Sequence, residues 1–483
     1  MGWKEVAEPV VTRMPGVRRP QGHVPFRRKL GWTAGVLALF FFLTNVPLFG
    51  LSGQAQNLYG ETFSAILAAQ QGSLMQLGIG PIVTASIVLQ LLNGADLLGL
   101  DTNDPRDQQI YQGLQKVLVV VMICLTGLPM VFLGGFLPAG DPLGIGLYAT
   151  KWLMFLQIAM GGILVLYMDE VVSKWGVGSG VGLFIVAGVS QSLVAGFIYW
   201  GAAGEAGGFI PTWIAIITGA RDIGPVLGGA GMDFVLFNSR AGLIPLATTL
   251  LIFAIVVYAE SVRVEIPLSH SRVKGARGRF PVKLIYASVL PMILVRALQA
   301  NFQFVGRLLA SEGMLPTWLG VYANGQAVSG ALYYLSPIRA PSDWMWWVAG
   351  TNREVWQILL RVGVDLTFMI VGGAIFAIFW VETADMGPEA TAKQIKNSGM
   401  QIPGFRKNVG VIEKVMERYI PQVTVIGGAL VGLLAVLANM LGTIGGVSGT
   451  GLLLAISITY KLYEEIAEEQ LMEMHPVMRQ MFG

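Results

Sequence analysis

The sequence offers few side chains for covalent or metal chemistry. Its one cysteine, Cys124, excludes an internal disulfide and a cysteine-based metal site. The three histidines, His23, His270 and His475, all lie in polar stretches, so no histidine pair stands in an apolar segment for metal binding or proton relay. No phosphate-binding loop of the form G-x-x-x-x-G-K-S/T occurs. We therefore expect no catalytic residues, no metal and no cofactor, and an energy source outside the chain.

Ionisable residues are also rare in the apolar segments. Solute transporters and ion pumps usually carry such groups there, because a charge in the membrane is costly unless it binds or relays something. Arg296 is the main exception. Its side chain either reaches the outer interface or a watery cavity, the interpretation we favour, or has a specific role. Arg361 and Asp365 are four residues apart, a spacing that predicts an ion pair along one helix.

The composition is that of a polytopic membrane protein. Of 483 residues, 54% are hydrophobic and 13% are charged, and the mean hydropathy is +0.63. A bilayer core about 30 Å thick needs roughly 20 apolar residues of helix. Ten segments are predicted to span it: 31–49, 77–93, 114–137, 150–168, 181–200, 243–262, 284–304, 358–381, 421–441 and 449–463.

The placement of positive charge orients these ten spans. With both termini inside, the inner segments hold 24 Lys and Arg residues and the outer segments hold 7. Cytoplasmic loops are enriched in Lys and Arg, so the sequence predicts a multi-pass cell-membrane protein with both termini in the cytoplasm. The expected organisation is a cytoplasmic segment 1–30, a first half 31–200, an external loop 201–242, a second half 243–463 and a cytoplasmic tail 464–483.

Five spans in each half mean that any structural repeat must be inverted, as in many transport proteins. Ser179–Ile185 opens the fifth span and Ser448–Leu454 opens the tenth, and both segments read S-G-x-G-L-x-aliphatic. Chance recurrence of glycine, of which the chain has 62, explains this match equally well.

Glycine and proline interrupt the apolar runs, at Gly78–Pro81, Gly176–Gly182, Pro291 and Gly445–Gly451. Such breakers are tolerated at membrane depth where the backbone lines a cavity or where neighbouring helices repair its hydrogen bonds. Bare aliphatic residues stand beside them, and these can form a dry seal but cannot coordinate an ion or a polar solute. The outer stretch 50–76 contains a short amphipathic segment, which is either an ordinary surface loop or a re-entrant helix.

Two inner loops, 263–283 and 382–420, hold six basic residues each. Orientation of the spans is one explanation of this charge. The second loop, however, is 39 residues long, which is more than orientation needs. Exposed Arg and Lys on such loops could instead dock phosphate-rich RNA.

Several long motifs follow one another along essentially the whole chain: Leu77–Thr84, Tyr167–Lys174, Gly178–Ile185, Tyr258–Leu268, Phe379–Thr383 and Gly404–Arg406. In these motifs the sequence resembles the SecY family of protein-conducting channels, in its archaeal and eukaryotic-like form. The resemblance implies an all-α polytopic membrane protein. Its ten transmembrane helices would form two inverted pseudo-symmetric halves of five around an hourglass pore, closed by a plug helix at about 55–72.

The resemblance also implies roles for individual residues, by motif position. The pore ring would consist of Ile79, Val83, Val181, Ile185, Ile293 and Leu454. The plug would include Leu58, Tyr59, Thr62, Phe63, Ile66 and Leu67. Spans two and three on one side, with seven and eight on the other, would form a lateral gate that includes Thr84, Ser288, Val289 and Pro291. Val289 stands where many relatives carry Asn, so the usual polar contact across the gate is not expected from this position.

The implied partners are those of a translocation channel. They are a SecE-type subunit, a small third single-span subunit of the SecG or beta type, signal sequences and nascent polypeptides, the lipid bilayer, and a ribosome. Signal recognition particle and its receptor would act before ribosome docking. The docking residues would be Arg272, Lys274, Arg277, Arg279, Arg406 and Lys407.

The implied function is a passive conduit that moves unfolded secretory polypeptides across the membrane and releases transmembrane segments into lipid, driven by an external partner. Two other classes remain open on the residues alone. A secondary solute transporter would need binding groups at mid-membrane, where this chain offers aliphatic residues. An intramembrane enzyme would need a Ser/His, paired Asp or metal constellation, and none can be assembled from this sequence. The residues therefore favour a channel.

Overall fold

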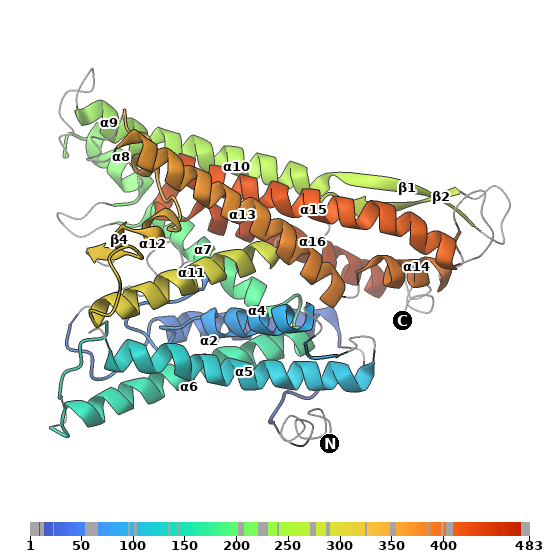
Figure 1. The fold of residues 1–483 in the computed structure, drawn as a ribbon, viewed down its shortest axis with the longest axis horizontal. Coiled ribbons are helices and arrows are strands. Elements are labelled where there is room, and N and C mark those ends of the chain that lie inside the picture. Colours follow the sequence, from blue (N-terminus) through green and yellow to red (C-terminus); the bar gives the residue numbers. More distant parts are fainter. Residues whose placement is uncertain are drawn as a thin grey trace.

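Helices packed side by side form the body of the molecule (Figure 1). The computed structural model describes residues 9, 14–22, 24–53, 66–94, 97–100, 104–133, 136–142, 144–200, 207–220, 230–238, 241–270, 277–285, 290–323, 326–347, 354–384, 386–397, 400–401 and 409–474. Within these ranges ten helices have 15 or more residues: α2 (Phe26–Thr44), α4 (Gly80–Gly94), α5 (Pro105–Phe132), α6 (Leu147–Trp175), α7 (Gly180–Ile198), α10 (Leu243–Ser261), α11 (Leu290–Ser311), α13 (Val355–Thr383), α15 (Val409–Leu441) and α16 (Gly449–Met474).

Each of the ten predicted spans coincides with one of these helices. Six of them, α5, α6, α7, α10, α13 and α15, are long and apolar enough to cross a membrane by length and composition alone. The other four depart from that pattern for visible reasons. Helix α4 is short, α2 begins with Arg27, Arg28 and Lys29, and α11 and α16 carry charged or amide side chains among their apolar ones.

The two halves of the chain occupy opposite sides of the bundle. In Figure 1 the helices α2, α4, α5 and α6 lie on one side, and α10, α13, α15 and α16 lie on the other. Helices α7 and α11 lie between them, where α7 contacts α16 and α11 contacts α4. The boundary between the halves therefore runs through the middle of the molecule.

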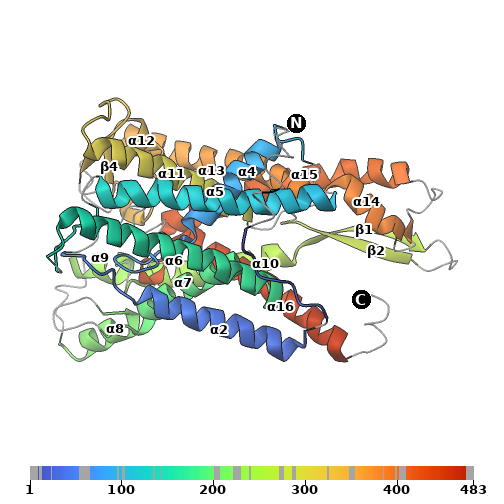
Figure 2. The ribbon, with the colours of Figure 1, turned by 90° about the horizontal axis from the view of Figure 1, so that it is seen from below.

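Shorter elements cover the two ends of the bundle (Figure 2). One end carries α8 (Phe209–Ile217), α9 (Ala230–Phe237), β3 (Val321–Ala323), β4 (Gln326–Ser329) and α12 (Ala331–Tyr334). The other end carries β1 (Arg263–His270), β2 (Arg277–Lys283), α14 (Pro388–Asn397) and β5 (Met400–Gln401). The sequence predicted loops here, so the strands are an addition to the helical framework.

The first and last long helices meet at the end that carries β1 and β2. The backbone N–H of Phe26, at the start of α2, donates to Glu473 over 2.6 Å, and Lys29 forms an ion pair with Glu469. Because α2 starts where α16 finishes, the chain enters and leaves the bundle at the same end. This agrees with an even number of spans.

Glycines let the helix backbones approach closely where the core is tightest. A Cβ on Gly428 of α15 would lie 2.5 Å from the carbonyl oxygen of Gly373 on α13, and one on Gly432 would lie 2.4 Å from that of Met369. Small residues are the usual means of packing helices within a membrane, where apolar burial alone does not drive association. Helices α13 and α15 are therefore expected to behave as one unit.

Candidate functional site

The six residues of the predicted pore ring come from four helices and belong to, or pack against, the large hydrophobic cluster that extends through the core of the described residues. Ile79 immediately precedes α4 and Val83 lies in its first turns, Val181 and Ile185 lie in α7, Ile293 in α11 and Leu454 in α16. All are buried except Val181, which is partly buried against the same cluster. The helices that carry them contact one another across the two halves, α4 with α11 and α7 with α16, and Val83, Val181 and Ile293 line one cavity.

The two S-G-x-G segments have the same local structure. The Ser179 hydroxyl accepts from the N–H of Gly182 over 3.1 Å, and the Ser448 hydroxyl accepts from the N–H of Gly451 over 3.0 Å. In each half a side chain of the preceding helix caps the third residue of the segment. Asp169 accepts from the N–H of Val181 over 2.9 Å, and Asn439 accepts from the N–H of Thr450 over 3.0 Å. This shared geometry favours a structural repeat over chance recurrence of glycine.

The described end of the predicted plug lies directly against the ring. Ile66 and Leu67 are buried, and the carbonyl oxygen of Leu67 accepts from the N–H of Ile79 over 2.8 Å. This approach requires Gly78, which has a φ of +53° and whose missing Cβ would lie 2.2 Å from that same oxygen. The remaining plug residues, Leu58, Tyr59, Thr62 and Phe63, lie outside the described residues.

A cavity of about 320 Å³ lies on the side of the ring toward the α14 end of the bundle. Three ring residues, Val83, Val181 and Ile293, form part of its wall. The rest of the lining includes polar side chains from four helices: Gln90, Tyr111, Gln115, Asp169, Ser173 and Thr383. The cavity therefore has partly polar walls, and the aliphatic ring residues lie at one side of it.

The predicted lateral gate is closed by contacts of α4 with α11 and α13. The amide of Asn301, in the middle of α11, donates to the hydroxyl of Thr84 over 3.1 Å. A polar contact across the gate is therefore present without Asn at position 289, and our expectation from that position was incomplete. Asn301 could have been noticed as one of three amides, with Gln299 and Gln303, inside the seventh predicted span. Pro291 is buried in the first turn of α11, whereas Ser288 and Val289 lie outside the described residues.

Comparisons with known proteins agree with this arrangement. The family model for SecY matches residues 73–463, and the model for the plug domain of Sec61p matches residues 39–72. The chain belongs to the SecY family. It is 71% identical to a protein translocase subunit SecY of Haloarcula marismortui, with 100% of both chains covered. The chain is thus a multi-pass membrane protein and a translocase subunit of the channel type, with a plug domain.

Two solved structures of this family have the same fold. The structure of a protein-conducting channel superposes with a TM-score of 0.80 at 38% identity, over 97% of this chain and 98% of the other. Sec61 in a canine ribosome–channel complex from the endoplasmic reticulum superposes with a TM-score of 0.77 at 38% identity, again over 97% and 98% of the two chains. The layout of ten helices in two halves is that of these channels.

The two basic inner loops join in one small sheet. Strand β1 pairs antiparallel with β2 on one side and with β5 on the other, where Ser269 is opposite Gln401. Arg277 and Arg279 lie in β2, opposite Ser269 and Pro267 of β1. The other predicted docking residues, Arg272, Lys274, Arg406 and Lys407, lie outside the described residues. Segments more than 100 residues apart in sequence thus form one platform at this end of the SecY fold.

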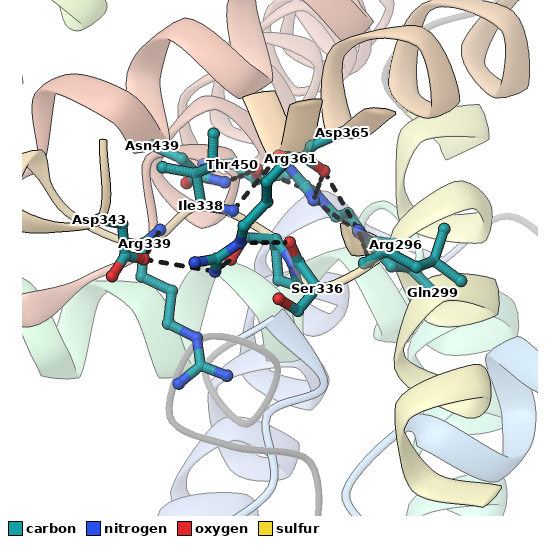
Figure 3. Close-up of polar contacts among 12 residues, drawn as sticks. Arg296, Gln299, Ser336, Ile338, Arg339, Asp343, Arg361, Asp365, Asn439 and Thr450 are labelled. Carbon is teal, nitrogen blue, oxygen red and sulfur yellow. Dashed lines mark hydrogen bonds and ion pairs between the residues drawn. The ribbon is translucent and has the colours of Figure 1, made fainter. Parts of the chain in front are cut away.

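Arg296 and Asp365 contradict two expectations from the sequence. Arg296 does not reach the outer interface, because its side chain is completely buried and pairs with Asp365 over 3.2 Å (Figure 3). Asp365 therefore does not pair with Arg361 along α13. Arg361 instead lies 3.5 Å from Asp343 and donates to the carbonyl oxygen of Pro337 over 2.8 Å. The carboxylate of Asp365 pairs with a guanidinium on another helix, α11, instead of one on its own helix.

No cluster of three or more His, Cys, Asp or Glu side chains that could hold a metal ion occurs among the residues that the structure describes.

Proposed function

We propose that this chain is the central subunit of a protein translocation channel in the cell membrane. It is a passive conduit that moves unfolded secretory polypeptides across the membrane and releases transmembrane segments sideways into lipid. One observation carries this proposal. Aliphatic ring residues of both halves, Val83, Val181 and Ile293, line one cavity, and the end of the plug is hydrogen-bonded to the backbone of a fourth, Ile79.

The chemistry of the ring suits a substrate of any sequence. Aliphatic side chains have no hydrogen-bonding groups, so they close around a passing chain without binding it. A constriction of this kind also hinders ions by excluding water. With the plug in place, the backbone of Ile79 is held by the carbonyl oxygen of Leu67, and the Ile79 side chain is buried in the core.

The lateral gate lies between α4 and α5 on one side and α11 and α13 on the other. Its described polar contact is the Thr84–Asn301 hydrogen bond, and most of the other residues of α4 are apolar. A sufficiently apolar segment replaces the apolar contacts between these helices with its own. The threshold for insertion is then set by how stable the closed gate is.

Partners supply the energy and the direction, and the chain itself is not an enzyme. A ribosome docks at the sheet of β1, β2 and β5 and at the basic loops that this sheet joins, after targeting by signal recognition particle and its receptor. The canine Sec61 relative in a ribosome–channel complex supports a ribosome as a partner. A SecE-type subunit holds the two halves together, a small third single-span subunit completes the complex, and both termini lie in the cytoplasm.

Reconstitution in liposomes tests the proposed seal. The chain is assembled with its partner subunits, and ion conductance is recorded before and after the six ring residues are replaced by Gly or residues 58–69 are deleted. The intact complex should be tight, and each change should make it leak. Replacing Ile412 and Ile420 by Gly is the matched control, since both are buried aliphatics of a separate cluster on α15.

A different result would reject the proposal. If neither the ring change nor the deletion produces a leak, and a small solute is taken up along an ion gradient, the chain is a transporter. The ring assignment would then be wrong.

A further inference from the structure

A fully buried polar network joins four helices of the second half (Figure 3). Arg296 of α11 donates through Nη1 to Asp365 of α13 over 3.2 Å and through Nε to Thr450 of α16 over 3.3 Å. Asn439 of α15 donates to the same Thr450 hydroxyl over 3.0 Å. Gln299, one turn along α11, donates to Asp365 over 3.1 Å and accepts from Arg296 over 2.6 Å. One guanidinium thus connects three helices directly and a fourth through Thr450.

This network lies one helical turn from two ring residues. Arg296 follows Ile293 by three positions in α11, and Thr450 precedes Leu454 by four positions in α16. Residues at these spacings share a helix face. The bond between Arg296 and Thr450 therefore links the two helices close to where Ile293 and Leu454 enter the ring.

The repeat between the halves makes the position of Thr450 informative. Thr450 corresponds to Val181, because each is the third residue of its S-G-x-G segment and is capped by the preceding helix. Val181 lines the cavity beside the ring, whereas Thr450 is completely buried and holds Arg296. At this position the second half thus has a residue that joins two of its own helices, whereas the first half has a residue that lines the cavity.

A buried ion pair is an unusual choice if packing were the only requirement. Hydrophobic residues of similar volume often stabilise a fold as well as a buried pair does. Hydrogen bonds to a buried carboxylate restrict helix positions more than apolar contacts do. The bonds form only in one arrangement of the helices that carry the donors. Asp365 accepts from two side chains of α11 and also from the N–H of Ile338 over 3.4 Å.

We propose that Arg296, Asp365 and Thr450 are positioning residues of the seal. They hold Ile293 and Leu454 in fixed register, so that the second-half part of the ring moves as one body with α13 and α15. Opening is then confined to the boundary between α4 and α11, where Thr84 meets Asn301. This inference rests on the pore ring of the proposed function.

The test is Thr450→Val in the reconstituted complex. This change keeps the side-chain volume and the Arg296–Asp365 pair, but it removes the hydroxyl that joins α16 to α11 and α15. We expect the ion leak of the resting channel to rise about five- to hundredfold, the range that the loss of two net hydrogen bonds, from Arg296 and Asn439, corresponds to. Thr424→Val is the matched control, because Thr424 of α15 is equally buried and its hydroxyl has no hydrogen-bond partner among the described residues.

Thermal stability of each variant is measured in parallel, since a merely structural role would lower stability and leave the leak unchanged. If Thr450→Val does not assemble, the double variant Arg296→Met with Asp365→Leu replaces it, because removing both charges leaves neither one buried and unpaired. The inference is overturned if the assembled variant is as tight as the parent while the Gly-substituted ring leaks. If the Gly-substituted ring is also tight, the pore ring itself is wrong and the proposed function fails with it.

Discussion

Gly78→Ala should release the plug from the ring. Gly78 has a φ of +53°, and a Cβ there would lie 2.2 Å from the carbonyl oxygen of Leu67 and 2.8 Å from backbone atoms of Ala68 and Ala69. These neighbours are backbone, so no side-chain rotation can make room. The end of the plug must move away from Ile79, and the hydrogen bond between Leu67 and Ile79 must break.

The size of the effect follows from two contributions. A left-handed backbone costs an alanine about 1–2 kcal/mol, and this strain is relieved only if the segment rearranges. The lost hydrogen bond contributes about 1 kcal/mol. Together these favour the unplugged arrangement by about 2–3 kcal/mol, which corresponds to a shift of about 30- to 150-fold in its population. The resting ion leak of reconstituted channels should rise accordingly.

Gly446→Ala separates backbone strain from the clash. Gly446 also has a positive φ, of +70°, but no atom lies within 4 Å of the position of its Cβ. Its substitution should lower stability and leave the leak unchanged. If Gly78→Ala channels are as tight as the parent, with the same protection of the plug from protease, the close approach of plug and ring does not contribute to the seal.

Three further predictions concern the gate, the buried pair and the docking platform. Thr84→Val removes a hydrogen bond of about 1 kcal/mol from the closed gate, so less hydrophobic Leu/Ala test segments should insert into lipid. Asp365→Leu leaves the Arg296 charge buried and alone, which should cost about 3–5 kcal/mol in unfolding free energy. Adding Arg296→Met should recover most of that loss, as measured by unfolding in detergent. Arg406→Glu with Lys407→Glu should weaken ribosome co-sedimentation, and the remaining binding should fall further with added salt.

Each of these predictions has a control and an outcome that contradicts it. For the gate, Thr424→Val should leave the insertion threshold unchanged, and an unchanged threshold in Thr84→Val itself would remove the hydrogen bond from the gating argument. For the buried pair, equal instability of the single and double variants would show that the charges are not the cause. For docking, Lys151→Glu at the start of α6 lies at the opposite end of the bundle, and an equal loss of binding there would point to non-specific charge.

The ten spans could be predicted because a membrane demands long apolar helices, but their ends could not. Helix α15 begins at Val409, twelve residues before the predicted span. Its first turns are amphipathic, and Ile412, Met416 and Ile420 pack at intervals of four against α14 and the end of α13. The apolar content alone does not reveal this stretch, because half of its surface is charged. Likewise, Val264, Ile266 and Leu268 recur at every second position in β1, a strand spacing that the charge count of the loop and the intervening Pro267 obscured.

The candidate site divides in a similar way. Ring positions follow motifs that are local in sequence, so each could be placed one helix at a time. Contacts between helices could not, because nothing near Arg296 indicates a partner 69 residues away, and nothing near Thr84 indicates one 217 residues away. The rule that predicted an Arg361–Asp365 pair considers one helix alone. It fails in a bundle where another helix presents a guanidinium to the same carboxylate.

The two halves of the molecule share the local structure at the start of one ring helix but differ in one side chain there. Both halves begin a ring helix with the same serine cap, and both secure the third residue with a side chain of the preceding helix. The third residue has a different role in each half. Val181 lines the cavity, whereas the hydroxyl of Thr450 accepts a hydrogen bond from Arg296. A half whose ring helices are tied to one another by buried hydrogen bonds is harder to rearrange internally than a boundary that has one described polar contact. Motion should therefore concentrate at the boundary between α4 and α11. Helix α11 contributes to both properties: Arg296 attaches it to its own half, and Asn301 forms the hydrogen bond to the other half.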